Sequence, residues 1–479
     1  MSENENKEKR GFGRKMSASD ITKCTIWVIL VLLFAFWMQS FVPLLAVPFV
    51  VDLYWSNFIK WDWWKCIKNG FLRGVMSWVD AIVFALCAVW VLQSFFFQNF
   101  KIPTTSLEKT MLAGDYLLVS KYHYGPRIPM TPFYLPLFQH TISIGGVDFC
   151  KSYLDEPKLP YRRMKGLKDV ERYDIVVFNY PNGDTVATKH QDDDYYRLKF
   201  HYGVKALHTN KSQYGDIIYR PVDRRENYVK RCVGLPGDEL KIVGDAVYIN
   251  GAKIDDPRYV QHNYFIITQP GSMIAERTWK NLGVYNSDLY EISNPQVSLA
   301  LGLEPDSITG QTSKIYMSPL TAEMKSKLSQ LKSVKEITQV PAEFFGKDYV
   351  YPLSENNEWT RSDYGPIFIP NQGSTIPLTP ENIAIYERCI RVYEGNDFTI
   401  EDGKCYLNGK PVTEYTFKMN YYWMMGDNRD NSADSRYWGF VPEDHVVGTP
   451  IMVWMSIDNE SGEWRKDRFF KRVSSIGKE

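Results

Sequence analysis

Ser106 and Lys230 are the residues of this chain whose types and neighbours best fit catalysis. Serine is a weak nucleophile and needs a general base that removes its proton. Histidine is the usual base, but the chain has seven, and none stands beside a serine in a recognisable turn. A lysine can serve instead if burial lowers its pKa from about 10.4, so that the amine is neutral. The pair predicts serine acyl chemistry without a metal or cofactor, and chelators should have no effect.

The neighbours of Lys230 are suited to burying an amine. Segment 228–238 reads Tyr-Val-Lys-Arg-Cys-Val-Gly-Leu-Pro-Gly-Asp and is apolar directly after the two cations. In a strand, successive side chains point to opposite faces. Tyr228 and Lys230 should then share one face, and Arg231 should point the other way.

Two further segments carry polar groups that could support this pair. Before Ser106, Pro103 holds the residue that precedes it in an extended conformation, and Thr104 and Thr105 add hydroxyl groups. Segment 426–442 reads Gly-Asp-Asn-Arg-Asp-Asn-Ser-Ala-Asp-Ser-Arg-Tyr-Trp-Gly-Phe-Val-Pro. Its Gly and Asn residues favour turns, and its aromatic end supplies an apolar anchor. This pattern predicts a structured polar loop.

Taken together, the three segments resemble the bacterial type I signal peptidases, which are membrane-anchored Ser-Lys proteases that remove signal peptides from exported proteins. The match is longest in segment 426–442. It is weakest around Ser106, where Leu107 and Lys109 differ from the common pattern. The resemblance implies that Ser106 is the nucleophile and Lys230 its neutral general base. It also implies an oxyanion hole made by the Ser106 backbone N–H and the Thr104 hydroxyl.

The resemblance also implies supporting residues and a substrate. Ser432 would orient the Lys230 amine, and Asp434 and Arg436 would form an ion pair that stiffens the loop. The substrate would be an extended segment with small residues, typically Ala, at the first and third positions before the cut. It could add as a strand beside 100–103 and 228–229. The candidate pocket walls are Phe100, Ile102, Pro103, Leu107, Met111, Tyr228 and Val229.

Two uncharged apolar runs precede the Ser106 segment, at residues 24–51 and 81–100. A helix needs about 20 apolar residues to cross a bilayer. We therefore expect a basic cytoplasmic N-terminus at 1–23, a membrane segment at 24–56, a cytoplasmic loop at 57–77 and a transmembrane helix at 78–100. The segment 24–56 is either a hairpin, turning near Gln39-Ser40 or at Pro43, or a single span. Lys60, Lys65, Lys68 and Arg73 place the loop in the cytoplasm and later residues outside.

Beyond this helical anchor the pattern predicts a mostly β catalytic domain at 101–479, with insertions at about 126–170 and 255–385. Segments 174–178 and 216–219 read as strands. Asn250-Gly251 and Asn408-Gly409 read as hairpin turns, within a weak repeat that relates 240–251 to 398–409. The clearest helical pattern in this domain is 321–331.

Charge and cysteine usage narrow the remaining classes. Lys plus Arg equals Asp plus Glu, at 56 each, which gives no support for a nucleic-acid partner. The seven cysteines include no C-x-x-C pair, so a zinc or thioredoxin-type site is not indicated. A disulfide among Cys150, Cys232, Cys389 and Cys405 stays open, with isolated thiols favoured. The predicted partners are preproteins, the lipid bilayer and the export machinery.

By resemblance, the location is a bacterial inner membrane, crossed more than once, with the catalytic domain on the periplasmic side. Two other readings compete with a signal peptidase. A self-cleaving protease like the SOS repressors would share the β core, but this chain offers no DNA-binding half and has membrane runs. A non-enzymatic tethered protein would be expected to have lost at least one of the five residues Ser106, Lys230, Ser432, Asp434 and Arg436, all of which are present.

Overall fold

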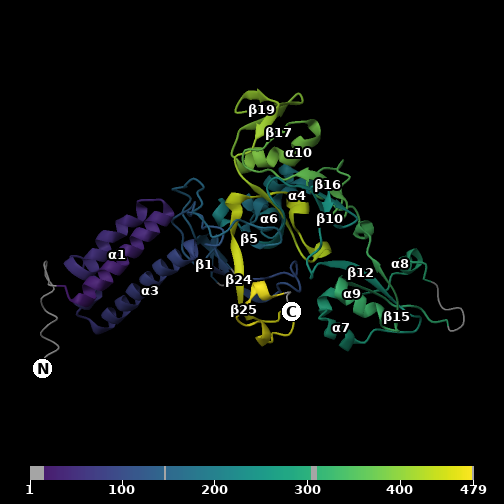
Figure 1. Ribbon diagram of the computed structural model, residues 1–479, viewed down its shortest axis with the longest axis horizontal. Helices are drawn as coiled ribbons and strands as arrows, with labels where there is room; N and C mark the ends of the chain where they lie inside the picture. The colour runs from purple at the N-terminus through teal and green to yellow at the C-terminus, as the bar shows by residue number, and fades with distance from the viewer. Residues whose placement is uncertain (1–15, 145–146, 304–309, 477–479) are drawn as a thin grey trace. The chain divides into compact units, whose positions relative to one another are not determined.

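The computed structural model describes residues 16–144, 147–303 and 310–476, and the chain forms two compact units (Figure 1). Unit 1 comprises Met1–Phe97 and Tyr122–Lys168, and unit 2 comprises Gln98–Lys121 and Asp169–Glu479. The expected basic segment 1–23 is therefore described only from residue 16 on. Segment 122–168 interrupts unit 2 in sequence, close to the expected insertion at 126–170, and it clusters with the helices of unit 1.

Two long apolar helices dominate unit 1: α1 (Ala18–Met38) and α3 (Gly70–Phe95). Both are long and apolar enough to cross a membrane. The Asn69 side chain caps α3 by accepting the Leu72 N–H. This helix therefore starts earlier than the expected segment 78–100 and ends at Phe95, before strand β1 (Phe97–Lys101). The uncharged run alone could not locate this start, because the Asn69 cap determines where the helix begins. The helix also includes the charged residues Arg73 and Asp80, which the uncharged run excludes.

Between these helices the chain forms a hairpin with α1. Gln39 ends α1 in the left-handed conformation, with φ of 47°. Three short helical segments, Val42–Ala46, Val47–Val51 (α2) and Asp52–Ser56, then return along α1. This returning stretch of 15 residues is about 22 Å long, shorter than a full crossing. The turn at Gln39 lies where the expected hairpin arrangement placed it.

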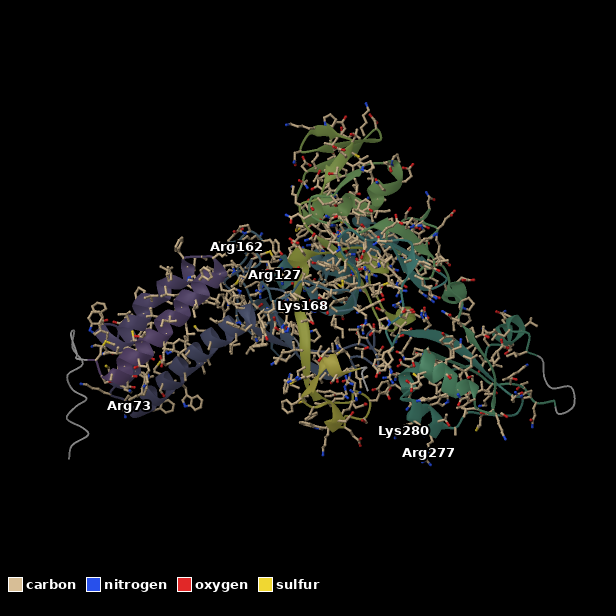
Figure 2. The ribbon with its side chains drawn as sticks, viewed as in Figure 1. Arg73, Arg127, Arg162, Lys168, Arg277 and Lys280 are labelled. Carbon is tan, nitrogen blue, oxygen red and sulfur yellow. The ribbon has the colours of Figure 1, made fainter. Side chains whose placement is uncertain are left out.

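The C-terminal ends of α1 and α3 meet segment 122–168. Met38, Phe95 and Met164 share one buried apolar cluster. The Arg162 guanidinium donates to the carbonyl oxygens of Met38 and Gln39, at 2.6 and 2.7 Å. A positive charge at this position is favourable, because the C-terminus of a helix carries a partial negative charge. Figure 2 labels Arg162 together with Arg127 and Lys168 of the same segment. Its regular part is the hairpin β3 (Thr141–Ile144) and β4 (Val147–Lys151).

Unit 2 is built on an antiparallel sheet whose strand order is β1-β2-β24-β5-β8-β22-β23, with β25 beside β24. The strands are β1 (Phe97–Lys101), β2 (Asp115–Ser120), β5 (Ile175–Asn179), β8 (Asn227–Gly234), β22 (Tyr421–Met425), β23 (Val441–Pro442), β24 (Val446–Ser456) and β25 (Lys471–Arg472). A small layer of β6 (Thr185–Ala187), β7 (Ile217–Tyr219), α4 (Tyr195–Tyr202), α5 (Val204–Thr209) and α6 (Lys211–Tyr214) lies between β5 and β8 in sequence. The mostly β prediction is confirmed.

The two predicted hairpins have the same geometry. One is β9 (Glu239–Val243), β10 (Ala246–Ile249) and β11 (Ala252–Lys253), and the other is β18 (Phe398–Glu401), β19 (Lys404–Leu407) and β20 (Lys410–Val412). Asn250 and Asn408 turn with φ of 52° and 51°, and each is followed by a glycine with positive φ. The repeat is therefore structural. It does not extend back to Lys230, because Arg388, at the equivalent position, lies in helix α10 (Pro380–Arg388) rather than in a strand.

Segment 255–385 divides between two structures. Its first part is a sheet of order β13-β14-β12-β15, with strands β12 (Gln261–Thr268), β13 (Tyr290–Ile292), β14 (Ile315–Thr321) and β15 (Val334–Gln339). Helices α7 (Glu276–Leu282), α8 (Pro295–Ala300) and α9 (Ala322–Ser329) accompany it, and α9 confirms the predicted helix. Its last part contains β16 (Tyr364–Phe368), which pairs with β9. This last part therefore packs with the first of the two hairpins.

The seven cysteines are free thiols. Cys232, Cys389 and Cys405 are buried, as expected for isolated small apolar residues, whereas Cys150 is exposed.

Candidate active site

The sheet brings the predicted nucleophile and base into contact. Lys230 lies in β8, which pairs with β5 on one side and β22 on the other. Ser106 lies in the turn that follows β1. Lys230 Nζ is 2.7 Å from Ser106 Oγ, and the two residues are 5 % and 7 % exposed. The two groups are therefore within hydrogen-bonding distance and shielded from water.

Burial changes the acidity of this amine. Desolvation lowers the pKa of Lys230 from 10.5 to about 8, and the carboxylates of Asp434 and Asp427 oppose the shift only in part. The Tyr228 ring centre is 5.7 Å from Nζ on the same strand face. Arg231 points the other way and forms two hydrogen bonds to Asp427, at 2.7 and 2.6 Å. The predicted alternation of the two cations is thus confirmed.

The turn that carries Ser106 is fixed by the loop after β22. The backbone N–H of Asn428 donates to the Ser106 carbonyl oxygen at 3.1 Å, and the Thr110 hydroxyl donates to Asp427 at 2.6 Å. Gly426 packs closely against Ser432 and the Ser106 carbonyl oxygen. A Cβ there would lie 2.2 Å from Ser432 Oγ and 2.7 Å from the Ser106 carbonyl oxygen, so this contact requires glycine.

The predicted ion pair in this loop is present. Asp434 accepts from Arg436 Nε at 2.9 Å and from Nη2 at 2.8 Å, and both side chains are buried. Burial alone would raise the pKa of Asp434, but Arg436 and two backbone N–H groups outweigh it and hold that pKa below its ordinary value. Asp434 also accepts the Gly426 N–H at 3.1 Å. The pair therefore fixes the glycine that contacts Ser106.

Two other supporting residues lie beside the dyad. The Thr104 hydroxyl oxygen is 3.4 Å from Ser106 Oγ. The Ser432 hydroxyl is buried and donates to the Ala433 carbonyl oxygen at 3.5 Å. No hydrogen bond joins Ser432 to Lys230 in the described part of the chain, so its orienting role stays a prediction.

Ser106 and Lys230 line a cleft of about 480 Å³. Five of the predicted pocket residues line it: Phe100, Ile102, Pro103, Tyr228 and Val229. Leu107 and Met111 do not. Both are completely or almost completely buried in the apolar cluster with Leu117 and Val119, because the turn after Ser106 directs them into the core. Their assignment to the pocket wall was wrong.

Sequence reasoning missed the polar wall of this cleft. It is lined by Tyr180, Asn182, Gln191, Asp192, Asp193, Arg220, Glu226 and Asn227. These residues come from the β5–β6 connection, from the segments that flank β6, β7 and the short helices, and from the first residue of β8. They are scattered polar residues with no spacing pattern, so only the fold could bring them together.

Comparison with known proteins agrees with this geometry. The family described as signal peptidase, peptidase S26, matches residues 75–286 and 414–455, which is more than half of the chain and includes all three motif segments. This chain belongs to the signal peptidase family, S26. It is accordingly a serine peptidase. Segment 287–413, which holds most of the second insertion, lies outside the match.

Named relatives are similar over most of their length. Signal peptidase I of Buchnera aphidicola subsp. Schizaphis graminum is 24 % identical over 81 % of this chain and 77 % of its own. That of Haemophilus influenzae is 23 % identical, over 81 % and 73 %. That of Pseudomonas aeruginosa is 22 % identical, over 78 % and 69 %. The similarity thus extends well beyond the motif segments.

The peptidase departs from the common family pattern at Lys109, and the structure shows what that lysine contacts. Lys109 has φ of 69°, and its ammonium donates to the Gly283 carbonyl oxygen and lies 5.6 Å from the Tyr285 ring centre. The neighbouring Glu108 carboxyl is buried without a hydrogen-bond partner among the described residues, and desolvation raises its pKa to about 7. The second expected insertion, 255–385, therefore contacts the turn that carries Ser106.

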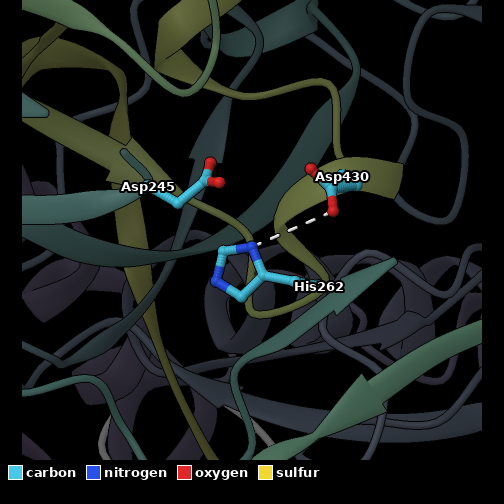
Figure 3. Close-up of side chains that lie close together, drawn as sticks. All are labelled: Asp245, His262 and Asp430. Carbon is cyan, nitrogen blue, oxygen red and sulfur yellow. Dashed lines mark ion pairs between the residues drawn. The ribbon is translucent and has the colours of Figure 1, made fainter. Parts of the chain in front are cut away.

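The insertion also reaches the loop after β22, through the residues of Figure 3. His262 Nδ1 of β12 lies 3.9 Å from Asp430 Oδ2, and potential ligand atoms of Asp245, His262 and Asp430 lie within 4.8 Å of one another. Asp430 already accepts from the Asn263 N–H at 2.7 Å and from Arg361 Nε at 3.1 Å. Because Arg361 supplies a fixed positive charge, we interpret this group as a polar network that holds the loop rather than as a metal site.

Proposed function

We propose that this peptidase removes N-terminal signal peptides from exported preproteins, cutting after small-x-small, Ala-x-Ala-like sites. Ser106 is the nucleophile and neutral Lys230 the general base. The observation that carries the proposal is the 2.7 Å contact between the buried Lys230 amine and the Ser106 hydroxyl, which both line the cleft. The family match and the names of the relatives support the substrate class.

The chemistry follows from these two groups. The neutral amine takes the Ser106 proton while Oγ attacks the scissile carbonyl carbon. The Ser106 N–H and the Thr104 hydroxyl stabilise the oxyanion. The Lys230 ammonium then gives its proton to the amine of the mature protein, which leaves. Water, deprotonated by Lys230, hydrolyses the ester, releases the signal peptide with a free carboxylate and restores Ser106.

The edges of the cleft suit an extended substrate. Strand β1 is an edge strand of the sheet, and β22 pairs with β8 only from Arg231 to Gly234. The backbone of 227–230 therefore faces the cleft on the side away from β5. A peptide added there would direct alternate side chains into the cleft. Residues one and three before the cut would point inward.

Cleavage of a purified preprotein tests this proposal. We expect a single cut, located by mass spectrometry of the mature N-terminus. Ala→Phe at the first or third position before the cut should stop cleavage, whereas Ala→Phe at the second position, as the matched control, should be tolerated. If substrates with Phe at the first or third position were still cleaved, the proposed specificity would be contradicted. If no preprotein were cleaved at all, the proposed function would be overturned.

Activity should depend on the ionisation of Lys230. Desolvation lowers its pKa to about 8, and only the neutral amine can accept a proton. Below that pKa the neutral fraction falls about tenfold per pH unit, to about 1 % at pH 6. We therefore expect kcat/KM to rise with pH and level off above about pH 8. The measurement is a cleavage profile from pH 6 to 10, with circular dichroism to verify folding. An acidic optimum would contradict the role of the base.

The helices of unit 1 suggest a topology. Because the C-terminal ends of α1 and α3 meet at one cluster, both helices run in the same direction. Asp20, near the start of α1, lines a hollow with Tyr54 and Lys60, so that end lies beside the loop before α3. Lys60, Lys65 and Lys68 in this loop favour a cytoplasmic location. We infer that the N-terminus is also cytoplasmic and that unit 2 is periplasmic, at the bacterial inner membrane.

Fusion reporters test this orientation. A reporter that is active only in the periplasm should give a signal when fused at the C-terminus and none at the N-terminus, and a reporter active only in the cytoplasm should give the reverse. A periplasmic signal from the N-terminus would contradict the hairpin arrangement. A cytoplasmic signal from the C-terminus would contradict a periplasmic catalytic domain.

A further inference from the structure

Segment Tyr122–Lys168 of unit 1 exposes many large apolar side chains for its length. They are Phe133 (58 %), Leu137 (71 %), Phe149 (76 %), Leu154 (60 %), Leu159 (39 %) and Leu167 (72 %). The described part of unit 2 is several times longer and exposes only ten of comparable size. Clustered exposed apolar side chains mark interaction surfaces, whereas single ones need no explanation.

Strand pairing shows that some of these side chains share one face. Tyr134 pairs with Tyr153 in an antiparallel bridge, and the Leu154 N–H donates to the Phe133 carbonyl oxygen. Phe133 and Leu154 are therefore opposite neighbours and project to the same side. The adjacent pair projects to the other side, where Tyr153 is buried and the Tyr134 hydroxyl lies 2.8 Å from Ser94 Oγ of α3. The pair Phe133 and Leu154 thus faces away from the helix.

Contacts within unit 1 place this segment at the level where both candidate spans end. Arg162 binds the last carbonyl groups of α1, and Trp37 Nε1 donates to the Lys165 carbonyl oxygen at 3.0 Å. Met164 packs with Met38 and Phe95 at the two helix ends. Trp37 and Trp90 lie in the same cluster, as is typical of side chains at a membrane interface. The exposed apolar side chains are therefore joined to helices whose own surfaces need lipid.

The net positive charge of segment 122–168 also fits contact with a lipid bilayer. It contains seven Lys and Arg residues against three Asp and Glu residues. Lys158 and Lys165 are exposed, and Arg127 and Lys168 lie on the same segment (Figure 2). Basic groups beside apolar side chains are the composition of surfaces that lie in the headgroup region, where cations bind lipid phosphates.

We propose that segment 122–168 is a membrane-surface module, which inserts its exposed apolar side chains into the outer leaflet of the bilayer and binds lipid phosphate groups with its basic residues. The choice of the outer leaflet rests on the proposed topology, whereas the contact with lipid does not. The module would give the peptidase a contact with the bilayer in addition to its two spans. Such a contact suits an enzyme whose substrates are themselves held at the membrane.

Photo-crosslinking of the full-length protein in lipid nanodiscs tests this contact. Benzoylphenylalanine is placed at Phe133 or Leu154, and at Leu299 of unit 2, which is 77 % exposed, as the matched control. We expect lipid adducts at 133 and 154 to exceed those at 299 by about tenfold or more, as measured by mass spectrometry. Adducts no more frequent than at 299, or crosslinks mainly to a second copy of the chain or to another protein, would overturn the proposal.

Charge reversal tests the phosphate contact. In nanodiscs that contain phosphatidylglycerol, the double variant Lys158→Glu/Lys165→Glu should lower lipid adducts at position 133 by roughly fivefold or more. Lys205→Glu, an exposed lysine of unit 2, should leave them unchanged. Unchanged adducts in the double variant would overturn the role of the basic residues. Neither measurement uses cleavage, so failure here and failure of the proposed peptidase function are distinguishable.

Discussion

Ser106→Ala, Lys230→Ala and Lys230→Arg should each lower preprotein cleavage by roughly ten-thousandfold or more. Without Ser106 there is no nucleophile. Without Lys230 the hydroxyl, 2.7 Å from Nζ, keeps its proton. Arginine is the sharper substitution, because it keeps the positive charge and much of the length of lysine, but a guanidinium cannot become a neutral base. The measurement is single-turnover cleavage of a preprotein by protein in detergent.

A matched control separates loss of the base from loss of the fold. Lys241→Arg changes another lysine of the same domain, one exposed on β9, and should leave cleavage and thermal unfolding unchanged. Each dyad variant should retain the circular dichroism spectrum of the wild type. Substantial cleavage by folded Lys230→Arg would show that another group takes the Ser106 proton.

The parts of the site that local patterns determine could be predicted from sequence. Alternation along β8 correctly separated Lys230 from Arg231, because the two faces of a strand are set by its period of two. The ion pair of Asp434 and Arg436, by contrast, was expected only from the resemblance to the signal peptidases, and it is present. Asn250 and Asn408 were predictable as turn positions, since few residue types tolerate positive φ.

The parts that depend on packing could not be predicted. Leu107 and Met111 have the same apolar character as Phe100, and only the direction of the turn after Ser106 sends them into the core. Segment 122–168 follows β2 in sequence, yet its contacts are with α1 and α3, which no local pattern reveals. The contact of Lys109 with Gly283 joins residues far apart in the chain. In the sequence, Lys109 stood out only because it departs from the common pattern of the signal peptidases.

Asp434→Ala should destabilise the peptidase strongly and abolish most of its activity. The substitution leaves the Arg436 guanidinium, which is 1 % exposed, without its carboxylate partner. Removing one partner of a buried ion pair typically costs about 3–5 kcal/mol, because the remaining charge stays desolvated. Gly426 also loses the acceptor of its N–H, so the loop that holds the Ser106 carbonyl oxygen is released. Thermal unfolding and kcat should both report the change.

A double variant separates the cost of an unpaired buried charge from the loss of the contacts that hold the loop. Asp434→Leu/Arg436→Met removes both charges, so it should recover part of the lost stability, since apolar replacements of buried pairs are often tolerated. It should not recover kcat, because Arg436 also donates to the carbonyl oxygens of Arg429 and Arg361, and those contacts fix the loop. Glu323→Ala, which removes the exposed partner of Lys327, is the control and should leave the Tm unchanged. Wild-type stability and kcat in Asp434→Ala would show that this pair does not support the nucleophile.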